Sequence, residues 1–237
     1  MNIEYKVGPR KSVLRKLGLA NLVSTAPFDI AAAHEALVRR QAVPERIETD
    51  GLIVDVPAGV YHPLPDSSSE FFIRNIKAMQ PVAKTLEIGC GCGIISLFLA
   101  ANWPASRVVA TDISPVAVAA TRDNARLNGL NLTAFESDLF EDIEERDFDL
   151  IIFNTPMIDK SPENDIEKFS LCDPNGRITE AYLRQASQHV SRDGLIIFSI
   201  CNNSAYEVLD NLDLDYSMVG FEYAYSGFWR AIVGARL

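Results

Sequence analysis

From residue 84 onward, short apolar runs alternate with amphipathic stretches along the chain. Apolar runs bounded by turn residues are typical of buried strands, and a period near 3.6 residues is typical of helices. The predicted strands are 85–89, 107–112, 132–137, 148–154 and 194–200, and the predicted helices are 94–102, 114–129, 178–191 and 204–212. Two further runs, 216–225 and 228–237, predict a C-terminal hairpin. Strands that alternate with helices predict an α/β fold with a mainly parallel sheet covered on both faces.

The first 80 residues have a different pattern. Segments 10–24 and 29–42 predict helices, with Asp29 as the cap of the second. The stretch 52–69 is interrupted by Pro and Gly, which predicts a short hairpin and a loop. A helix is predicted over 67–79, capped by Ser67 or Ser68. We therefore divide the chain into an N-terminal helical, substrate-side segment (1–48), a hairpin, loop and linking helix (49–80) and the main α/β domain (81–237).

Composition narrows the class of protein. The chain has 237 residues, of which 48% are hydrophobic and 23% charged, which is enough for one large core. No apolar run reaches the roughly 20 residues of a membrane span, so we expect a cytoplasmic protein with no membrane partner. Cys90, Cys92, Cys172 and Cys201 lack zinc spacing, and we expect free thiols and no metal site.

Charge is distributed unevenly. The net charge is −10, which argues against a large nucleic-acid footprint, because phosphate contacts need a basic surface. Residues 1–46 nevertheless carry eight basic and four acidic side chains, a net charge of +4, and leave −14 for the rest. The segment is either a basic appendage docked on an acidic body or a binding arm.

A glycine-rich turn follows the first strand of the main domain. Gly89, Gly91 and Gly93 allow a tight turn and a close approach of a ligand to a helix N-terminus. A dinucleotide fingerprint would require a glycine at 94, where this chain has Ile94, and an oxidoreductase is therefore disfavoured. Asp112 ends the second strand, where a carboxylate accepts hydrogen bonds from ribose hydroxyls or else caps the next helix.

The fourth strand of this series ends abruptly. The buried run 150–153 is followed by Asn154, Thr155, Pro156 and Met157. Asn and Pro are common turn residues, so a plain turn is one reading. In a parallel sheet, however, the carboxyl ends of the strands face the ligand crevice. We therefore expect Asn154 to lie at the site.

With these motifs, residues 70–237 resemble the class I S-adenosylmethionine-dependent methyltransferases. The resemblance implies a doubly wound, mainly parallel seven-stranded sheet with an antiparallel last strand, here in the C-terminal hairpin. It also implies S-adenosylmethionine as cofactor, with the glycine loop at its methionine part, Asp112 at the ribose and Asp138 with Leu139 along the adenine. The implied cofactor-binding residues are Glu87, Gly89, Cys90, Gly91, Gly93, Asp112, Ile113, Asp138, Leu139 and Asn154.

The segment 154–157 resembles the Asn-Pro-Pro-Tyr motif of methyltransferases that act on nitrogen, among them the release-factor glutamine methyltransferases. Their Arg-Pro-Asp-Thr-Glu signature is only partly matched, by residues 64–68. The resemblance implies that Asn154, Thr155, Pro156 and Met157 form the catalytic motif, with the side-chain oxygen of Asn154 and the backbone carbonyl of Thr155 orienting the acceptor nitrogen. Thr155 replaces the first Pro, which we expect to loosen the turn, and Met157 replaces the aromatic residue.

The predicted function is methyl transfer from S-adenosylmethionine to a nitrogen of a protein or peptide amide or of a small metabolite. Methylation of an RNA or DNA base and a cofactor-binding scaffold without catalysis are the alternatives. We expect residues 1–65 to form a lid that contributes little to folding of the sheet. Within it, Tyr61 is the predicted aromatic contact and His62 a candidate proton acceptor; the substrate-side residues are Tyr61, His62, Pro63 and Leu64.

Overall fold

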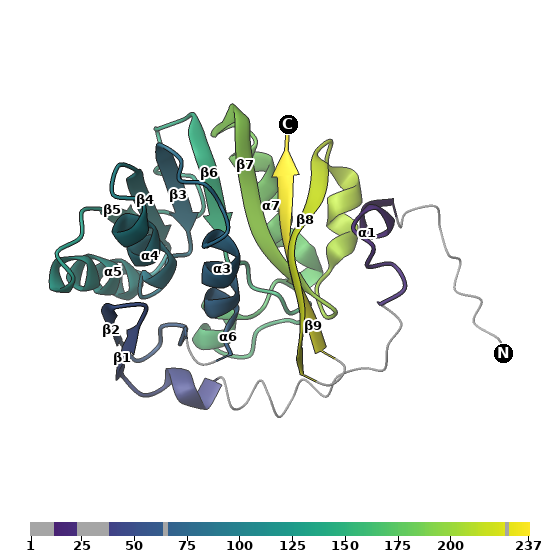
Figure 1. Ribbon diagram of the computed structural model, residues 1–237. Coiled ribbons are helices and arrows are strands. Elements are labelled where there is room, and N and C mark those ends of the chain that lie inside the picture. The colour runs from purple at the N-terminus through teal and green to yellow at the C-terminus, as the bar shows by residue number, and fades with distance from the viewer. Residues whose placement is uncertain (1–11, 23–37, 64–65, 226–227) are drawn as a thin grey trace.

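The computed structural model describes residues 12–22, 38–63, 66–225 and 228–237 (Figure 1). Among the described residues from 45 to the C-terminus, which carry the site, there are nine strands, five helices and two short 3-10 helices. The bounds are α1 (Ser12–Lys16), β1 (Glu45–Thr49), β2 (Leu52–Val56), α3 (Ser68–Ile76), β3 (Lys84–Ile88), α4 (Ile94–Asn102), β4 (Arg107–Asp112), α5 (Pro115–Leu127), β5 (Thr133–Glu136), β6 (Phe148–Phe153), α6 (Asp165–Ser170), η1 (Pro174–Gly176), α7 (Arg177–Ala186), β7 (Val190–Cys201), η2 (Tyr206–Asn211), β8 (Asp215–Tyr225) and β9 (Phe228–Arg236).

A seven-stranded sheet forms the centre of the molecule, in the order β5-β4-β3-β6-β7-β9-β8. Strands β3 to β7 are parallel, and β9 is antiparallel to both of its neighbours, β7 and β8. Leu150, Ile151 and Ile152 of the central strand β6 are each at most 2% exposed, as expected for a strand covered on both faces. The predicted fold, with its antiparallel last strand, is confirmed.

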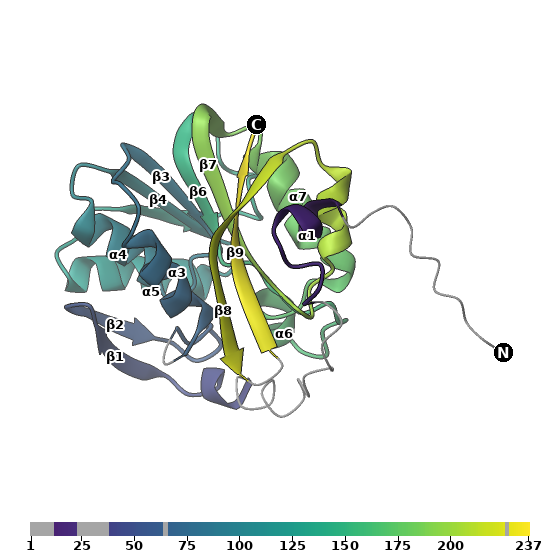
Figure 2. The ribbon, with the colours of Figure 1, turned by 45° about the vertical axis from the view of Figure 1, so that its right-hand side comes forward.

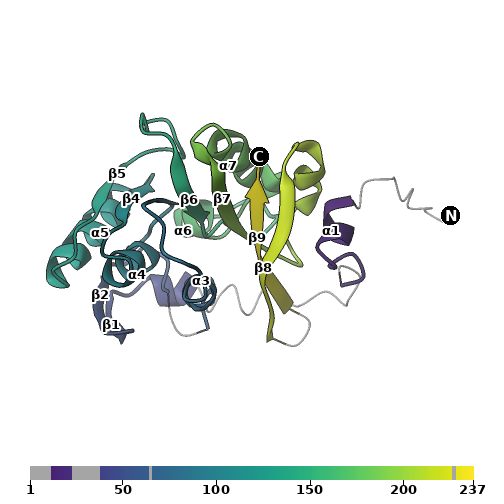
Figure 3. The ribbon, with the colours of Figure 1, turned by 45° about the horizontal axis from the view of Figure 1, so that its top comes forward.

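The two faces of the sheet are covered by different elements (Figures 1 and 2). Helices α3, α4 and α5 and the hairpin β1–β2 contribute to one hydrophobic cluster. Helix α7, η2 and α1 contribute to a second cluster, on the other side. Figure 3 shows the hairpin beside α4 and α5, and α1 at the opposite end of the sheet.

The N-terminal segment differs from the prediction. In place of a helix over 10–24, α1 covers only Ser12–Lys16, and most of 29–42, with the predicted Asp29 cap, lies outside the described residues. Leu14 is buried in the core that α7 and the sheet share, and the backbone N–H of Val13 donates to Asp210 Oδ1 at 3.0 Å. Lys16 pairs with Asp215 of β8. The expectation that residues 1–65 add little to the folding of the sheet is therefore wrong for α1, which is docked on it.

The hairpin starts earlier than the sequence predicted. Strand β1 pairs antiparallel with β2 in register Glu45↔Val56 to Thr49↔Leu52. The turn between them has Asp50 and Gly51 at positive φ, which favours such residues. A boundary between residues 48 and 49 therefore falls inside β1. Among the described residues, no helix combines the length and the apolar character needed to cross a bilayer.

Candidate active site

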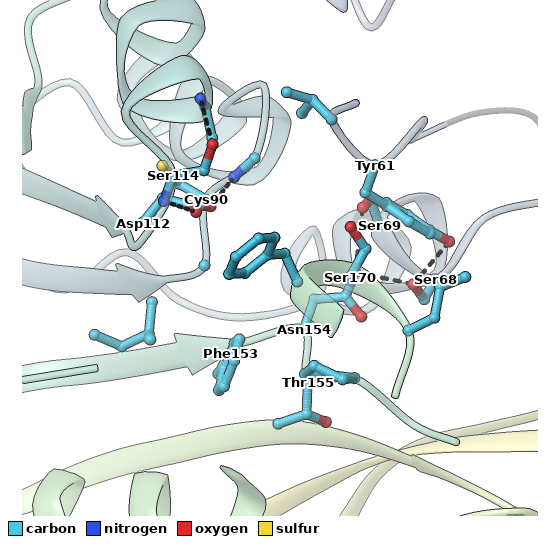
Figure 4. A pocket seen from close by; sticks show the side chains of 18 of the residues that line it. Tyr61, Ser68, Ser69, Cys90, Asp112, Ser114, Phe153, Asn154, Thr155 and Ser170 are labelled. Carbon is cyan, nitrogen blue, oxygen red and sulfur yellow. Dashed lines mark hydrogen bonds between the residues drawn. The ribbon is translucent and has the colours of Figure 1, made fainter. Parts of the chain in front are cut away.

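A cavity of about 420 Å³ opens at the carboxyl ends of β3, β4 and β6. The loop after β2, the start of α3 and the end of α6 close its other side. Figure 4 shows Asp112, Ser114 and Cys90 together at one end, and Tyr61, Ser68, Ser69, Asn154 and Ser170 at the other. We call the first the cofactor end and the second the acceptor end. The volume lies in the range of small-molecule sites.

The glycine turn 89–93 forms the floor of the cofactor end. Gly89 has φ 64°, and a Cβ there would lie 2.6 Å from Phe153 Cε2. Gly93 has φ 86°, and its Cβ would lie 2.8 Å from Thr121 Oγ1. Side chains at these positions would meet both backbone strain and a clash. The two glycines are therefore required by the turn itself, and Cys90, Gly91 and Gly93 lie where the sequence predicted them.

Asp112 is the last residue of β4 and points across this turn. Its Oδ2 accepts a hydrogen bond from the N–H of Gly91 at 2.9 Å, and its Oδ1 accepts one from the N–H of Ser114 at 2.9 Å. Burial raises its pKa above the usual value, and these bonds partly oppose that rise. Asp112 lines the cavity, and each of its carboxylate oxygens can accept a further hydrogen bond. The residue is thus held by backbone donors in a position to accept hydrogen bonds from two neighbouring hydroxyls.

Glu87 lies beneath the glycine turn and lines the cavity. Its Oε2 accepts hydrogen bonds from the backbone N–H of Ser96, at 2.8 Å, and from the Ser96 hydroxyl. Burial raises its pKa from 4.5 to about 8, because the Ser96 bonds only partly replace the water that would stabilise the carboxylate. At neutral pH the protonated form of the Glu87 carboxyl group is therefore favoured.

The remaining predicted cofactor residues also line the cavity. Ile113 follows Asp112 and is 45% exposed. Asp138 and Leu139 follow β5, and Leu139 has φ 50° with its carbonyl accepting from Ser137 Oγ at 3.0 Å. The cavity is thus lined by all of the residues that the sequence predicted for the cofactor except Gly93.

Asn154 follows β6 at the acceptor end. Its Nδ2 donates to Ser68 Oγ at 2.8 Å and to Ser69 Oγ at 3.3 Å, and its Oδ1 accepts from Ser199 Oγ at 3.3 Å. A residue of a plain turn would have no need of partners on α3 and β7. The amide is instead held by three side-chain hydroxyls, of which those of Ser68 and Ser69 lie at the wall of the cavity (Figure 4).

Thr155 does not loosen the turn, contrary to the prediction. Its hydroxyl donates to the carbonyl oxygen of Ser199 at 2.5 Å and lies 3.0 Å from Ser199 Oγ. The residue is 2% exposed, so these contacts with β7 fix the turn that a proline ring would otherwise stiffen. Pro156 and Met157 line the cavity, and the carbonyl of Met157 accepts from Ser204 Oγ at 2.8 Å.

The loop after β2 supplies two of its four predicted residues to the cavity. Tyr61 and Pro63 line it, and the Tyr61 hydroxyl lies 3.3 Å from Ser68 Oγ. His62 does not line it: its Nε2 lies 2.9 Å from Glu45 Oε2, and the ring is buried. His62 therefore joins the loop to β1 and is not placed as the predicted proton acceptor. Leu64 lies outside the described residues.

Helix α6 was missed by sequence reasoning, although it carries part of the cavity wall. Lys168, Phe169 and Ser170 line the cavity, and the Lys168 ammonium lies 4.9 Å from the centroid of the Phe169 ring. The sequence does contain a signal, because the Asn164 side chain caps the helix by accepting from the N–H of Glu167 at 3.0 Å. An Asn followed three residues later by Glu is a helix-start pattern.

Four features together define the class I methyltransferase architecture. They are the order of the strands in the sheet, the glycine turn after β3, the carboxylate at the end of β4 and the polar motif after β6. The chain belongs to the methyltransferase small domain family, which matches residues 51–216. The predicted resemblance and the predicted cofactor, S-adenosylmethionine, are confirmed. Asp112 and the glycine turn fit that cofactor. The carboxylate can accept hydrogen bonds from hydroxyl groups, and the glycines let a ligand approach the backbone closely.

The names of relatives of this chain indicate two kinds of methyl acceptor. A candidate protein N5-glutamine methyltransferase of Methanocaldococcus jannaschii is 37% identical over 123 residues, or 52% of this chain and 60% of that protein. The release factor glutamine methyltransferase of Geobacter sulfurreducens is 33% identical over 148 residues, 62% of this chain and 49% of its own length. The ribosomal RNA small subunit methyltransferase C of Salmonella arizonae is 35% identical over 111 residues, 46% and 32% of the two chains. This chain therefore spans between 32% and 60% of their lengths.

The fold is shared with solved methyltransferases. The tRNA (uracil-54, C5)-methyltransferase of Pyrococcus abyssi, in complex with S-adenosyl-L-homocysteine, matches 81% of this chain and 44% of its own. The TM-score is 0.55 and the sequence identity 13%, so the likeness concerns the fold alone.

Proposed function

We propose that this chain transfers a methyl group from S-adenosylmethionine to the nitrogen of a carboxamide in a protein, the side-chain amide of glutamine being the acceptor class that fits best. The observation that carries the proposal is the position of Asn154. Its amide is held at the acceptor end, facing Asp112 across one continuous cavity. The names of two relatives, both glutamine methyltransferases, agree with this acceptor.

The chemistry requires orientation more than a strong base. An amide nitrogen is a poor nucleophile, because its lone pair is delocalised into the carbonyl. Asn154 Oδ1 and the Thr155 carbonyl each accept one N–H of the acceptor and direct the nitrogen toward the cofactor end. Such positioning contributes up to roughly 7–11 kcal/mol in well-aligned reactions. S-adenosylmethionine supplies an electrophilic methyl: the sulfur–carbon bond breaks, a nitrogen–carbon bond forms, the sulfonium becomes a thioether and one N–H proton passes to solvent.

The lining of the acceptor end suits a neutral polar group. Besides Asn154 it presents the hydroxyls of Tyr61, Ser68, Ser69 and Ser170. Hydroxyls both donate and accept, and so match the N–H and carbonyl groups of a carboxamide. Among the described lining residues, Lys168 is the single cation. That lining favours an amide over a phosphate-bearing acceptor.

Methylation of an RNA base is the second candidate. The relative of Salmonella arizonae, named as an enzyme of ribosomal RNA, favours it. The net charge of −10 disfavours it, because non-specific affinity for nucleic acid comes from phosphate contacts. A scaffold without catalysis is disfavoured by the ordered hydrogen bonds of Asn154, which cofactor binding alone does not require. A cytoplasmic location stays a prediction from composition.

The test is methyl transfer to separated acceptor pools. The protein is incubated with S-adenosylmethionine labelled in the methyl group, and with either an RNA-free protein extract or a protein-free RNA preparation. Label is expected in protein, and mass spectrometry is expected to place it on glutamine. Acid hydrolysis then releases labelled methylamine, because the carboxamide bond is cut.

The matched control is the Asn154→Ala variant, which is expected to bind the cofactor but leave both pools unlabelled. Label in RNA alone would replace the proposed acceptor with a base. Labelled protein that releases no methylamine would exclude an amide nitrogen as the acceptor atom.

A further inference from the structure

Helix α5 and its C-cap residue direct three polar side chains at the glycine turn and at strand β2. Thr121, Asn124 and Asn128 follow one another at intervals of three and four residues and therefore share one side of the helix. Thr121 and Asn124 are at most 1% exposed. The glycine turn lies against this side of α5, and so does strand β2.

Asn124 contacts both of these segments at once. Its Oδ1 accepts from the backbone N–H of Asp55 at 2.8 Å, and its Nδ2 donates to the carbonyl of Asp55 at 2.9 Å. The same Nδ2 donates to the carbonyl of Cys92, in the glycine turn, at 2.9 Å. Backbone groups have fixed donor and acceptor roles, so the orientation of this amide is fully determined. One buried side chain thus joins β2 to the glycine turn.

The other two side chains each contact only one of the segments. The Thr121 hydroxyl donates to the carbonyl of Gly91 at 3.0 Å, in the glycine turn. Asn128 Oδ1 accepts from the N–H of Ile53 at 2.9 Å, and its Nδ2 donates to the carbonyl of Ile53 at 2.7 Å. Asn124 and Asn128 therefore hold β2 in the same way, and they differ in the bond to Cys92.

Strand β2 continues into the loop 57–63, which reaches the acceptor end. The N–H of Gly59 donates to the carbonyl of Gln41, which precedes β1, at 2.7 Å, and His62 lies beside Glu45 of β1. Val60 Cγ1 lies 3.7 Å from the position that a Cβ on Gly91 would take. The hairpin and the loop therefore form one unit that rests on the glycine turn.

We propose that Asn124 is a positioning residue that couples the loop 57–63 to the glycine turn, so that occupation of the cofactor end sets the geometry of the acceptor end. The proposal rests on the proposed function only in naming this loop as part of the acceptor site. The Asn124 side chain itself does not line the cavity. It acts through Cys92 on one side and through Asp55 on the other.

Amide hydrogen exchange of the full chain tests the coupling without any acceptor. Exchange is followed in 57–63 and 89–93 with no ligand and with saturating S-adenosylhomocysteine, in the wild type, Asn124→Ala and the matched control Asn128→Ala. Without ligand, Asn124→Ala is expected to exchange about fivefold faster in both segments, since buried hydrogen bonds are lost. Asn128→Ala is expected to exchange faster in the hairpin and its loop only.

With S-adenosylhomocysteine, the wild type and Asn128→Ala are expected to show slower exchange at 57–63, and Asn124→Ala is not. Equal slowing in all three proteins would overturn the proposal, because direct contact with the ligand would then suffice. Loss of the slowing in both variants would also overturn it, because docking of β2 would then explain the effect. Asn124→Asp keeps the volume and the bond from Asp55 N–H, and it replaces Asn124→Ala if that variant does not fold.

The readout separates this proposal from the proposed function. Slower exchange at 57–63 that depends on Asn124 supports the coupling even if no carboxamide is methylated. Conversely, undiminished methylation of glutamine by Asn124→Ala would leave the acceptor assignment intact. It would contradict the proposal that Asn124 sets the geometry of the acceptor end.

Discussion

The two ends of the cavity are built in different ways. At the cofactor end, Asp112 accepts from the backbone N–H groups of Gly91 and Ser114, and the turn owes its shape to glycine. At the acceptor end, Asn154 is held by hydroxyls of Ser68 and Ser199, which come from elements far apart in the chain. The first end depends on backbone geometry within neighbouring loops, and the second depends on side chains that meet only in the folded protein.

The difference has a consequence for specificity. Every residue except proline supplies a backbone N–H, so the two hydrogen bonds to Asp112 use no side chain of the neighbouring residues. The acceptor end loses or gains a hydrogen bond with each changed hydroxyl. A family that keeps one cofactor and changes its acceptors can therefore vary the second end and leave the first intact.

Asn154→Ala should give the largest effect and separate the two ends most clearly. Loss of the carbonyl that orients the acceptor nitrogen is expected to lower turnover by about a hundredfold or more, comparable to the loss of one preorganised group in other active sites. Cofactor affinity, measured by calorimetry with S-adenosylhomocysteine, should change by less than about threefold, roughly the scale of one peripheral contact. A large loss of cofactor affinity would show that the ends are not separable.

Asp112→Ala should have the opposite effect. Two backbone N–H groups lose their acceptor, as do the ribose hydroxyls that we expect Asp112 to bind, so cofactor affinity is expected to fall by about 10- to 100-fold. Turnover at saturating cofactor should stay within about threefold, because the acceptor end is untouched. Asp112→Asn, which keeps one oxygen, should lie between the wild type and the alanine variant in the same titration.

Glu87 gives the cofactor end a pH dependence, because burial raises its pKa to about 8. The folded protein keeps the Glu87 proton up to about pH 8, whereas the unfolded chain releases it near 4.5. The folded state therefore binds more protons within this window, and the free energy of unfolding should decrease as pH rises through it. Urea titrations of the wild type and Glu87→Gln should show the decrease in the wild type and a flatter profile in the variant. A steeper profile in Glu87→Gln would contradict this assignment.

Substitutions of Tyr61 should have the smallest effect. They separate the contribution of its hydroxyl at the acceptor end from that of its ring. Tyr61→Phe removes the contact with Ser68 and keeps the ring, so the KM for a glutamine-containing acceptor is expected to rise by about two- to fivefold, as for one exposed hydrogen bond. Tyr61→Ala removes the ring as well and should raise KM further, without a change in cofactor affinity. Equal KM values for the two variants would mean that the ring makes no contact with the acceptor.

The main α/β domain was predictable from local pattern. Apolar runs such as 148–153 can be buried on both faces only in a covered sheet, and alternation with helices makes that sheet parallel. The glycines at 89 and 93 and the carboxylate at 112 were also identifiable, because a turn at positive φ and a strand-end acceptor depend on residues close together in sequence. Spacing along the chain therefore determined the cofactor end.

Tertiary structure alone decided the acceptor end and its connections. His62 contacts Glu45 and does not line the cavity. Thr155 has hydrogen-bond partners on β7 that the sequence pattern did not predict. From the sequence, Asn124 is an ordinary helix residue. Only the tertiary structure shows that it lies between β2 and the glycine turn and bonds to both. Side-chain hydrogen bonds between distant segments depend on how elements pack, and no local periodicity encodes that packing. The sequence by itself thus determined the fold and the cofactor, and the packing of distant elements determined how Asn154 and Thr155 are held at the other end of the cavity.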